Sequence, residues 1–208
     1  MIAHRAMRVL APAGLAVLLL TMGAAMRPLI SSDEQTAAPV LTATEIGFVQ
    51  DMVAHHSQAL ILVQRLDPGA GPGVLALAGQ IADAQRTELG MLLGWLRLAG
   101  APVTNAEPMG WTVGARHHSD ALAAHTDSVM PGMASTAELD ELAAARGVQA
   151  EVLFLRLMQR HHYGGIQMAA AAEEILSSGE VKRAARDMIT GQGREVGLLG
   201  MLLAQRAS

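Results

Sequence analysis

A pattern of Phe, Met and two adjacent histidines occurs twice in this chain, and the repetition limits the possible folds more than any other feature. The first copy reads FVQDMVAHH at residues 48–56, and the second reads FLRLMQRHH at residues 154–162. A Gln-x-x-Glu pattern follows each copy at nearly the same distance. The apolar spacing within each copy fits one face of an α-helix. The sequence therefore predicts two similar helical hairpins whose apolar faces pack together.

The composition agrees with helices. The chain is 51% hydrophobic but only 2% aromatic, so its core must consist of Ala, Leu, Val and Met, which favour helices over short aromatic-rich strands. We expect an all-α fold, a four-helix bundle made of two repeated hairpins. Capping boxes at Thr42 and Ser135 mark two helix starts. The expected helices cover about 43–66, 73–99, a short segment ending near 146, about 148–177 and about 180–205.

The N-terminus has the pattern of an export signal. Arg5 and Arg8 precede an apolar run that ends near Met26, a length between that of a signal peptide and that of a membrane anchor. The positive charges place the rest of the chain outside the cytoplasm, with membrane contact only through this segment. The predicted organisation is a signal peptide or anchor at 1–26, a flexible tether at 27–41, and a helical bundle at 42–208 comprising a first repeat (42–100), a linker (101–147) and a second repeat (148–206).

Charge and motifs exclude several functions. A net charge of −4 and a pI near 6.0 give no surface for nucleic acid. Cysteine is absent, which removes thiolate nucleophiles and Cys-based metal sites. No H-E-x-x-H, G-x-S-x-G or Glu-x-x-His pattern occurs. We therefore expect a protein that is not an enzyme, with a metal-dependent redox enzyme as the less favoured alternative.

Histidines on the buried face of a helix point to a metal ion. Buried imidazoles need partners, because an unpaired buried polar group costs about 1–3 kcal/mol. Imidazole and thioether without thiolate suit Cu(I) or Ag(I), and copper is the favoured ion. The alternative is that the histidines are structural or sense pH, with methionines that only fill the core. The expected ligands are Met52, His55 and His56 in the first copy and Met158, His161, His162 and Met168 in the second.

Two further groups of residues could support such a site. Four side chains on the second arms of the hairpins could orient the histidines, or could simply belong to solvated faces: Gln85, Glu88, Gln192 and Glu195. Asp51, four residues before His55, could also support that ring. The linker could capture an ion and pass it on, or could be a solvated connection with chance histidines; its residues are His117, His118, His125, Met130 and Met133.

These residues resemble those of an exported bacterial family, domain of unknown function 305 (DUF 305). The resemblance rests on Phe48, Met52, His55, His56, Ala59, Gln85, Glu88, Trp95 and Leu96, and on MPGM at 130–133 followed by FLRLMQRHHYGGIQMA at 154–169. It implies a ferritin-like bundle and, as for some members of the family, copper handling outside the cytoplasm. The expected partners are a metal ion and a metal-delivery or acceptor protein. The chain departs from the pattern at Leu62, which stands opposite Met168, at Gly165 in place of Ala, and at Met201-Leu202 in place of Trp-Leu. The first site could therefore be weaker than the second, or purely structural.

Overall fold

The computed structural model describes residues 22, 39–114 and 130–207 of the chain. The predicted signal or anchor segment, most of the tether, and His117, His118 and His125 of the linker lie outside the described residues. Within the described part of the chain, no helix is long and apolar enough to cross a membrane. The chain from Val40 onward forms one compact unit, which contains all the elements discussed below.

Five α-helices and one short 3-10 helix make up this unit, and the described residues contain no strand, so the all-α prediction is confirmed. The predicted helix ends agree with the structure to within two residues. The elements are α2 (Ala43–Arg65), α3 (Pro72–Leu98), the 3-10 helix η1 (Gly110–Gly114), α4 (Thr136–Ala144), α5 (Gly147–Ile175) and α6 (Glu180–Ala207).

Local sequence accounts for where the helices begin. The side chain of Thr42 accepts a hydrogen bond from the backbone N–H of Glu45, whose carboxylate accepts one from the N–H of Thr42 in return. Ser135 and Glu138 form the same reciprocal pair at the start of α4. Pro72 occupies the first turn of α3, where its missing N–H costs nothing. These caps hold the helix ends in place.

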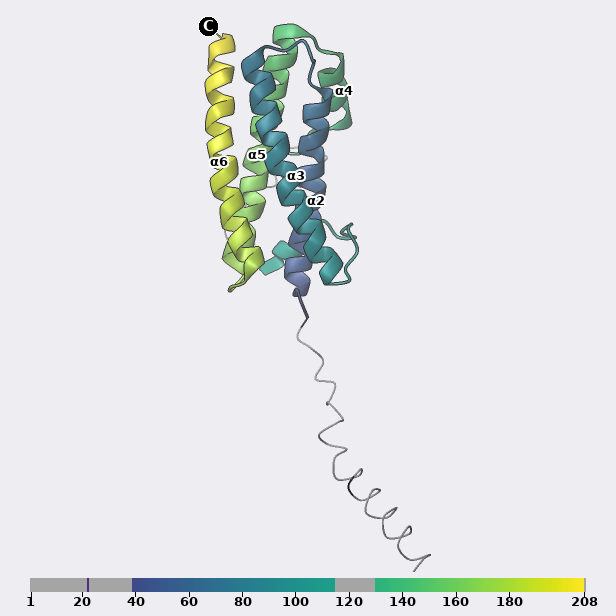
Figure 1. Cartoon of the computed structure of the whole chain (residues 1–208). Helices are drawn as coiled ribbons and strands as arrows, with labels where there is room; N and C mark the ends of the chain where they lie inside the picture. Colours follow the sequence, from purple (N-terminus) through teal and green to yellow (C-terminus); the bar gives the residue numbers. More distant parts are fainter. Residues whose placement is uncertain (1–21, 23–38, 115–129, 208) are drawn as a thin grey trace, which may run out of the picture. The chain divides into compact units, whose positions relative to one another are not determined.

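The four long helices run side by side as two hairpins (Figure 1). Helix α2 packs along α3, α5 packs along α6, and α2 and α5 join the hairpins through the middle of the bundle. The short helix α4 lies beside the C-terminal end of α2, where Arg65 Nη1 is 2.7 Å from Asp140 Oδ1. The likeness to ferritin-like bundles stays a prediction.

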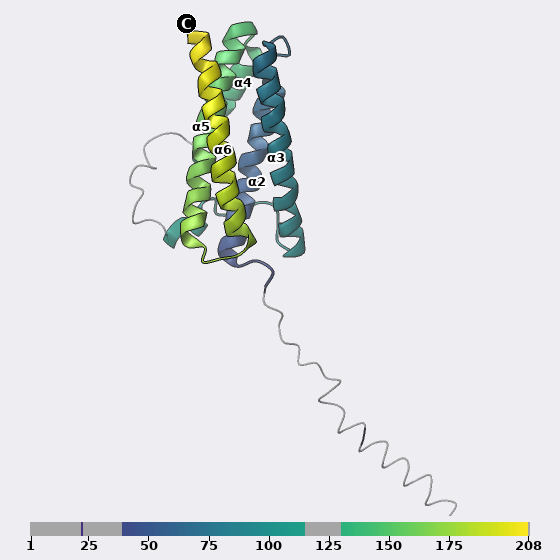
Figure 2. The ribbon, with the colours of Figure 1, turned by 60° about the vertical axis from the view of Figure 1, so that its left-hand side comes forward.

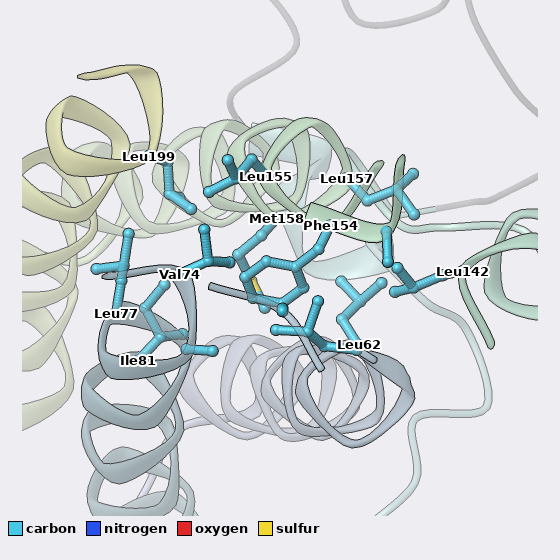
Figure 3. Packing of buried hydrophobic residues seen from close by; sticks show 14 of the residues in the cluster. Leu62, Val74, Leu77, Ile81, Leu142, Phe154, Leu155, Leu157, Met158 and Leu199 are labelled. Carbon is cyan, nitrogen blue, oxygen red and sulfur yellow. The ribbon is translucent and has the colours of Figure 1, made fainter. Parts of the chain in front are cut away.

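Two apolar clusters fill the interior, one toward each end. The first surrounds Phe154 and Met158 and includes Leu62, Ile81 and Leu142 (Figure 3). The second contains Phe48, Met52, Met168 and Met188, among others. On every long helix, residues of one cluster give way to residues of the other along the chain. The segment between them on each helix carries polar side chains. We call these eight side chains the central polar layer: His55, His56, Gln85, Glu88, His161, His162, Gln192 and Glu195.

Candidate metal centre

All four histidines of the central polar layer are enclosed by the bundle. His55 is 1% exposed, and His56, His161 and His162 are 0% exposed. Each pair is adjacent in sequence near the middle of α2 or α5, so both rings flank the apolar stripe that these helices turn toward each other. The ring centroids of His55 and His161 are only 3.9 Å apart, with an interplanar angle of 34°. The two central helices therefore meet through imidazoles.

The outer histidine of each pair is held by a glutamate from the neighbouring helix. His56 Nε2 lies 2.5 Å from Glu88 Oε2 on α3, and His162 Nε2 lies 2.6 Å from Glu195 Oε2 on α6. A carboxylate accepts hydrogen bonds, so in both rings Nε2 is the donor, and a neutral imidazole with its hydrogen on Nε2 has its lone pair on Nδ1. Neither Nδ1 has a hydrogen-bond partner among the described residues. A histidine oriented by a carboxylate in this way is the usual arrangement of a metal ligand.

The inner pair, His55 and His161, differs in its hydrogen bonds. His55 Nε2 donates to the carbonyl oxygen of Pro131 at 3.2 Å, and because a carbonyl only accepts, its Nδ1 is again the free atom. His161 has no partner at either ring nitrogen within the described part of the chain. Together the four rings present five buried nitrogens that no described group satisfies.

Burial keeps the inner rings neutral. Desolvation, followed by the nearby His56, lowers the pKa of His55 from 6.5 to about 3. Desolvation, followed by His55, lowers the pKa of His161 well below 6.5. Both shifts have the expected sign, since burial disfavours the charged form of an imidazole. Neutral imidazole is the form that binds metals, so a metal ion would not have to displace a proton from either ring.

The buried donors fit a soft ion. Met52, Met158 and Met168 are each 0% exposed and belong to the apolar clusters on either side of the central polar layer. Among the described residues, no three His, Asp or Glu side chains lie close enough together to hold one ion. The side chains in and beside the layer offer imidazole and thioether as donors. That ligand set is typical of Cu(I), a soft ion that accepts sulfur.

The two glutamines of the layer are buried without complete hydrogen bonding. Gln85 is 2% exposed and Gln192 3%, and neither Gln85 Oε1 nor either amide atom of Gln192 has a partner among the described residues. Both glutamines thus belong to the same layer as the histidines, but in the described part of the chain these amide atoms form no hydrogen bond to a ring. The amide of Gln192 instead packs against Gly165, where a Cβ atom would lie 3.0 Å from Nε2 and still closer to Oε1.

Asp51 does not support His55, so that prediction is wrong. Its carboxylate accepts from Asn105 Nδ2 at 2.9 Å, from the backbone N–H of Met109 at 2.6 Å and from Trp111 Nε1 at 2.8 Å. All three donors belong to the first part of the linker, which follows α3. Spacing along α2 could not reveal these partners, because they lie more than fifty residues away in the sequence. Asp51 therefore holds this segment against the bundle through three hydrogen bonds.

The MPGM motif lies directly on the histidine layer. The Pro131 carbonyl receives the His55 hydrogen bond, and Gly132 adopts a φ of 77° that favours glycine. Gly164 on α5 makes this approach possible, because a Cβ atom there would collide with the carbonyl of Pro131 and lie 2.8 Å from the Gly132 Cα. Met130 packs against the second apolar cluster, and the Met133 carbonyl lies 3.4 Å from Arg160 Nη2. The roles of Pro131 and Gly164 were not predicted; the paired glycines after His161-His162 were the available signal.

The chain is similar to proteins of known sequence and structure. A family model described as domain of unknown function (DUF305) matches residues 45–203. A DUF305 protein from Streptomyces coelicolor, described as a candidate secreted protein, is 36% identical with a TM-score of 0.68, and the match covers 79% of this chain and 94% of that one. A DUF305 fragment from Deinococcus radiodurans is 32% identical with a TM-score of 0.63, over 79% of this chain and 97% of the fragment.

A third solved structure shares the fold at lower identity. It is CopM in its Cu(II)-bound form, 21% identical with a TM-score of 0.57, over 77% of this chain and 96% of CopM. A comparison with curated proteins finds no match. The fold and the layer define an all-helical protein with paired histidines buried between two hairpins. The family match over most of the chain identifies it further: the chain belongs to the DUF305 family.

Proposed function

We propose that this protein binds copper as Cu(I) in the central polar layer. The observation that carries the proposal is the set of five buried imidazole nitrogens without a partner, flanked by buried thioethers. Their desolvation is costly in the metal-free protein, and coordination to an ion would offset that cost. His55, His56, His161 and His162 would supply imidazole nitrogen, and Met52, Met158 and Met168 would supply thioether sulfur. Ag(I) is a soft ion of the same charge that the same donors would accept.

The setting favours handling of copper outside the cytoplasm. The N-terminal sequence has the features of an export signal, and one relative of 36% identity is described as a candidate secreted protein. CopM, which shares the fold, is described in a Cu(II)-bound form. We infer sequestration or transfer of copper, with a delivery or acceptor protein as partner. A binding role without catalysis suits a centre whose rings are at most 1% exposed, since a substrate could not reach them.

The competing proposal is a helical interaction module whose histidines sense pH. A pH sensor needs a group that titrates near the working pH. Burial lowers the pKa of His55 to about 3 and that of His161 well below 6.5, which places these inner rings outside the range from pH 5 to 8. In the folded protein these inner rings therefore stay neutral across this range, and a response to pH would have to act through unfolding.

A competition titration tests the proposal. The full-length chain would be titrated anaerobically with Cu(I) against a chromophoric chelator, beside a variant in which His55, His56, His161 and His162 are all changed to Ala. A matched control would change the three linker histidines, His117, His118 and His125, to Ala and leave those of the bundle intact. We expect binding in the parent and the control and a loss of at least about 100-fold in affinity in the bundle variant, equivalent to about 2.7 kcal/mol.

Each outcome distinguishes the candidate sites. Binding that survives in the bundle variant but fails in the linker control would place the ion in the linker. Absence of binding in the parent would overturn the copper proposal. Circular dichroism of each variant would show that the helices remain folded.

A further inference from the structure

A surface cavity lies beside the central polar layer, between α3 and α6. Its volume is about 330 Å³. Both helices lie on one side of the bundle, with α2 behind the space between them (Figure 2). The residues that matter here are Glu88, Met91 and Trp95 from α3, and Arg183, Asp187 and Met188 from α6. The cavity therefore opens onto the layer where Glu88 stands.

Glu88 connects this cavity to a buried ring. Its side chain is 25% exposed, while the imidazole of His56, 2.5 Å from its Oε2, is 0% exposed. The Nδ1 atom of this His56 ring has no hydrogen-bond partner among the described residues. Glu195, the equivalent residue of the second hairpin, is 16% exposed and is not one of the residues that line this cavity. The cavity thus adjoins the glutamate of one histidine pair and not that of the other.

The lining of the cavity suits a soft cation. A thioether stands on each wall, Met91 at 36% exposure and Met188 at 1%, so one sulfur is near the solvent and the other is buried. Arg183 pairs with Glu180, so Asp187 and Glu88, the latter hydrogen-bonded to His56, contribute negative charge to the lining. Negative charge in a concave surface raises the local concentration of cations. Trp95 adds an aromatic ring, a group that can attract cations, to the lining.

We propose that this cavity is the entrance through which a soft monovalent ion reaches His56, with Met91 and Met188 as transfer ligands and Glu88 as the link to the ring. The inference rests on the copper-binding proposal and deepens it, because it assigns a route to the same centre. Residues on a route change the rates of loading and release in the same proportion. They leave the equilibrium affinity unchanged, since that depends only on the end states.

Loading kinetics test the entrance. Ag(I) would be mixed with the full-length chain in a stopped-flow instrument, and loading would be followed by tryptophan fluorescence. The test variant carries Met91→Leu and Met188→Leu, substitutions that conserve volume and remove sulfur. The matched control is Met201→Leu, because Met201 is an exposed methionine of α6 that lines a different cavity. Met91→Leu alone serves as a second variant, since its partly exposed site tolerates change.

We expect the double variant to load and release Ag(I) about tenfold more slowly, with a dissociation constant within about twofold of the parent. The control should match the parent in both. Unchanged rates in a variant that binds as tightly as the parent would overturn the entrance and leave the copper proposal standing. A loss of affinity as large as the loss of rate would also overturn it, because the methionines would then be ligands of the final site. Absence of Ag(I) and Cu(I) binding in the parent would overturn both proposals.

Discussion

The first hairpin, α2 and α3, and the second, α5 and α6, place the same types of side chain in the central polar layer but leave different atoms unpaired. His56–Glu88 and His162–Glu195 are nearly identical pairs. His55, however, donates to the Pro131 carbonyl, whereas both nitrogens of His161 lack a partner among the described residues. The first half is therefore tied to its surroundings, and the second half keeps more free donor atoms.

The difference extends beyond the rings. Asp51 in the first hairpin anchors the segment that contains Trp111, while its counterpart in the second hairpin is the apolar Leu157. Conversely, the second hairpin carries the buried Met168 where the first has Leu62. The same helical pattern thus holds a loop in place in the first half, through Asp51, and provides an additional thioether in the second half, through Met168. We expect the second half to contribute more to metal binding and the first half more to the position of the loops.

The largest expected effect is a decrease in the free energy of unfolding as the pH falls. The ordinary pKa of histidine, 6.5, applies to the unfolded chain, while the folded pKa is about 3 for His55 and well below 6.5 for His161. The unfolded state then binds more protons below pH 6.5. The stability that depends on neutral rings is fully present above pH 6.5 and falls as the pH decreases, by about 2 kcal/mol at pH 5 for His55, with a further loss from His161.

Urea denaturation of the metal-free protein between pH 7 and 5 measures the slope of the free energy of unfolding against pH. A variant with Leu at both positions 55 and 161 should lose most of this slope. Glu138, whose pKa is lowered to about 2 chiefly by Arg160, weakens the fold only below pH 4.5 and does not interfere. A slope unchanged in the double variant would show that the inner rings titrate normally.

The next effect concerns the anchor that only the first hairpin has. Changing Asp51 to Leu, the residue at the corresponding place in the second hairpin, removes the acceptor of three hydrogen bonds. We expect a loss of about 3 kcal/mol, because hydrogen bonds to a charged group contribute about 1.5–3 kcal/mol each and water replaces part of them. Asp51→Asn should lose less. Thermal denaturation measures the stability, and the fluorescence of Trp111 should shift toward that of an exposed indole; an unshifted spectrum would contradict the anchor.

These two halves also show what sequence alone could and could not give. Periodicity and capping residues located the five helices and the buried face that carries His55, His56, His161 and His162, because both signals are local. The partners of Asp51 and His55 were not predictable, since each comes from a loop whose path depends on the packed bundle. The contact of the two inner rings likewise depends on how α2 and α5 cross. The proposed ligand set stays a prediction in both halves.

Two adjacent glycines of α5 offer a smaller test of the contact between the loop and the histidines. A Cβ atom at Gly164 would collide with the backbone of Pro131, while one at Gly165 would meet only the end of the Gln192 side chain. We expect Gly164→Ala to destabilise by about 2 kcal/mol and Gly165→Ala by about 1 kcal/mol or less, since backbone cannot move aside as a side chain can. Equal losses, measured by urea denaturation, would contradict the close approach of Pro131 to α5.

The smallest effect has the opposite sign and addresses the free nitrogens directly. Replacing His161 by Leu removes two buried polar atoms that lack partners, so the metal-free protein should become more stable by about 1–2 kcal/mol. His55→Leu should change stability by less than about 0.5 kcal/mol, because it removes one unpaired nitrogen but also leaves the Pro131 carbonyl without its donor. Urea denaturation in the presence of a chelator measures both. The His161 variant should bind Cu(I) more weakly even as it gains stability, which is the behaviour of a residue kept for binding. A His161→Leu protein that is less stable than the parent would mean that ordered water satisfies this ring, and the contrast between the halves would then lie in hydration instead of free donor atoms.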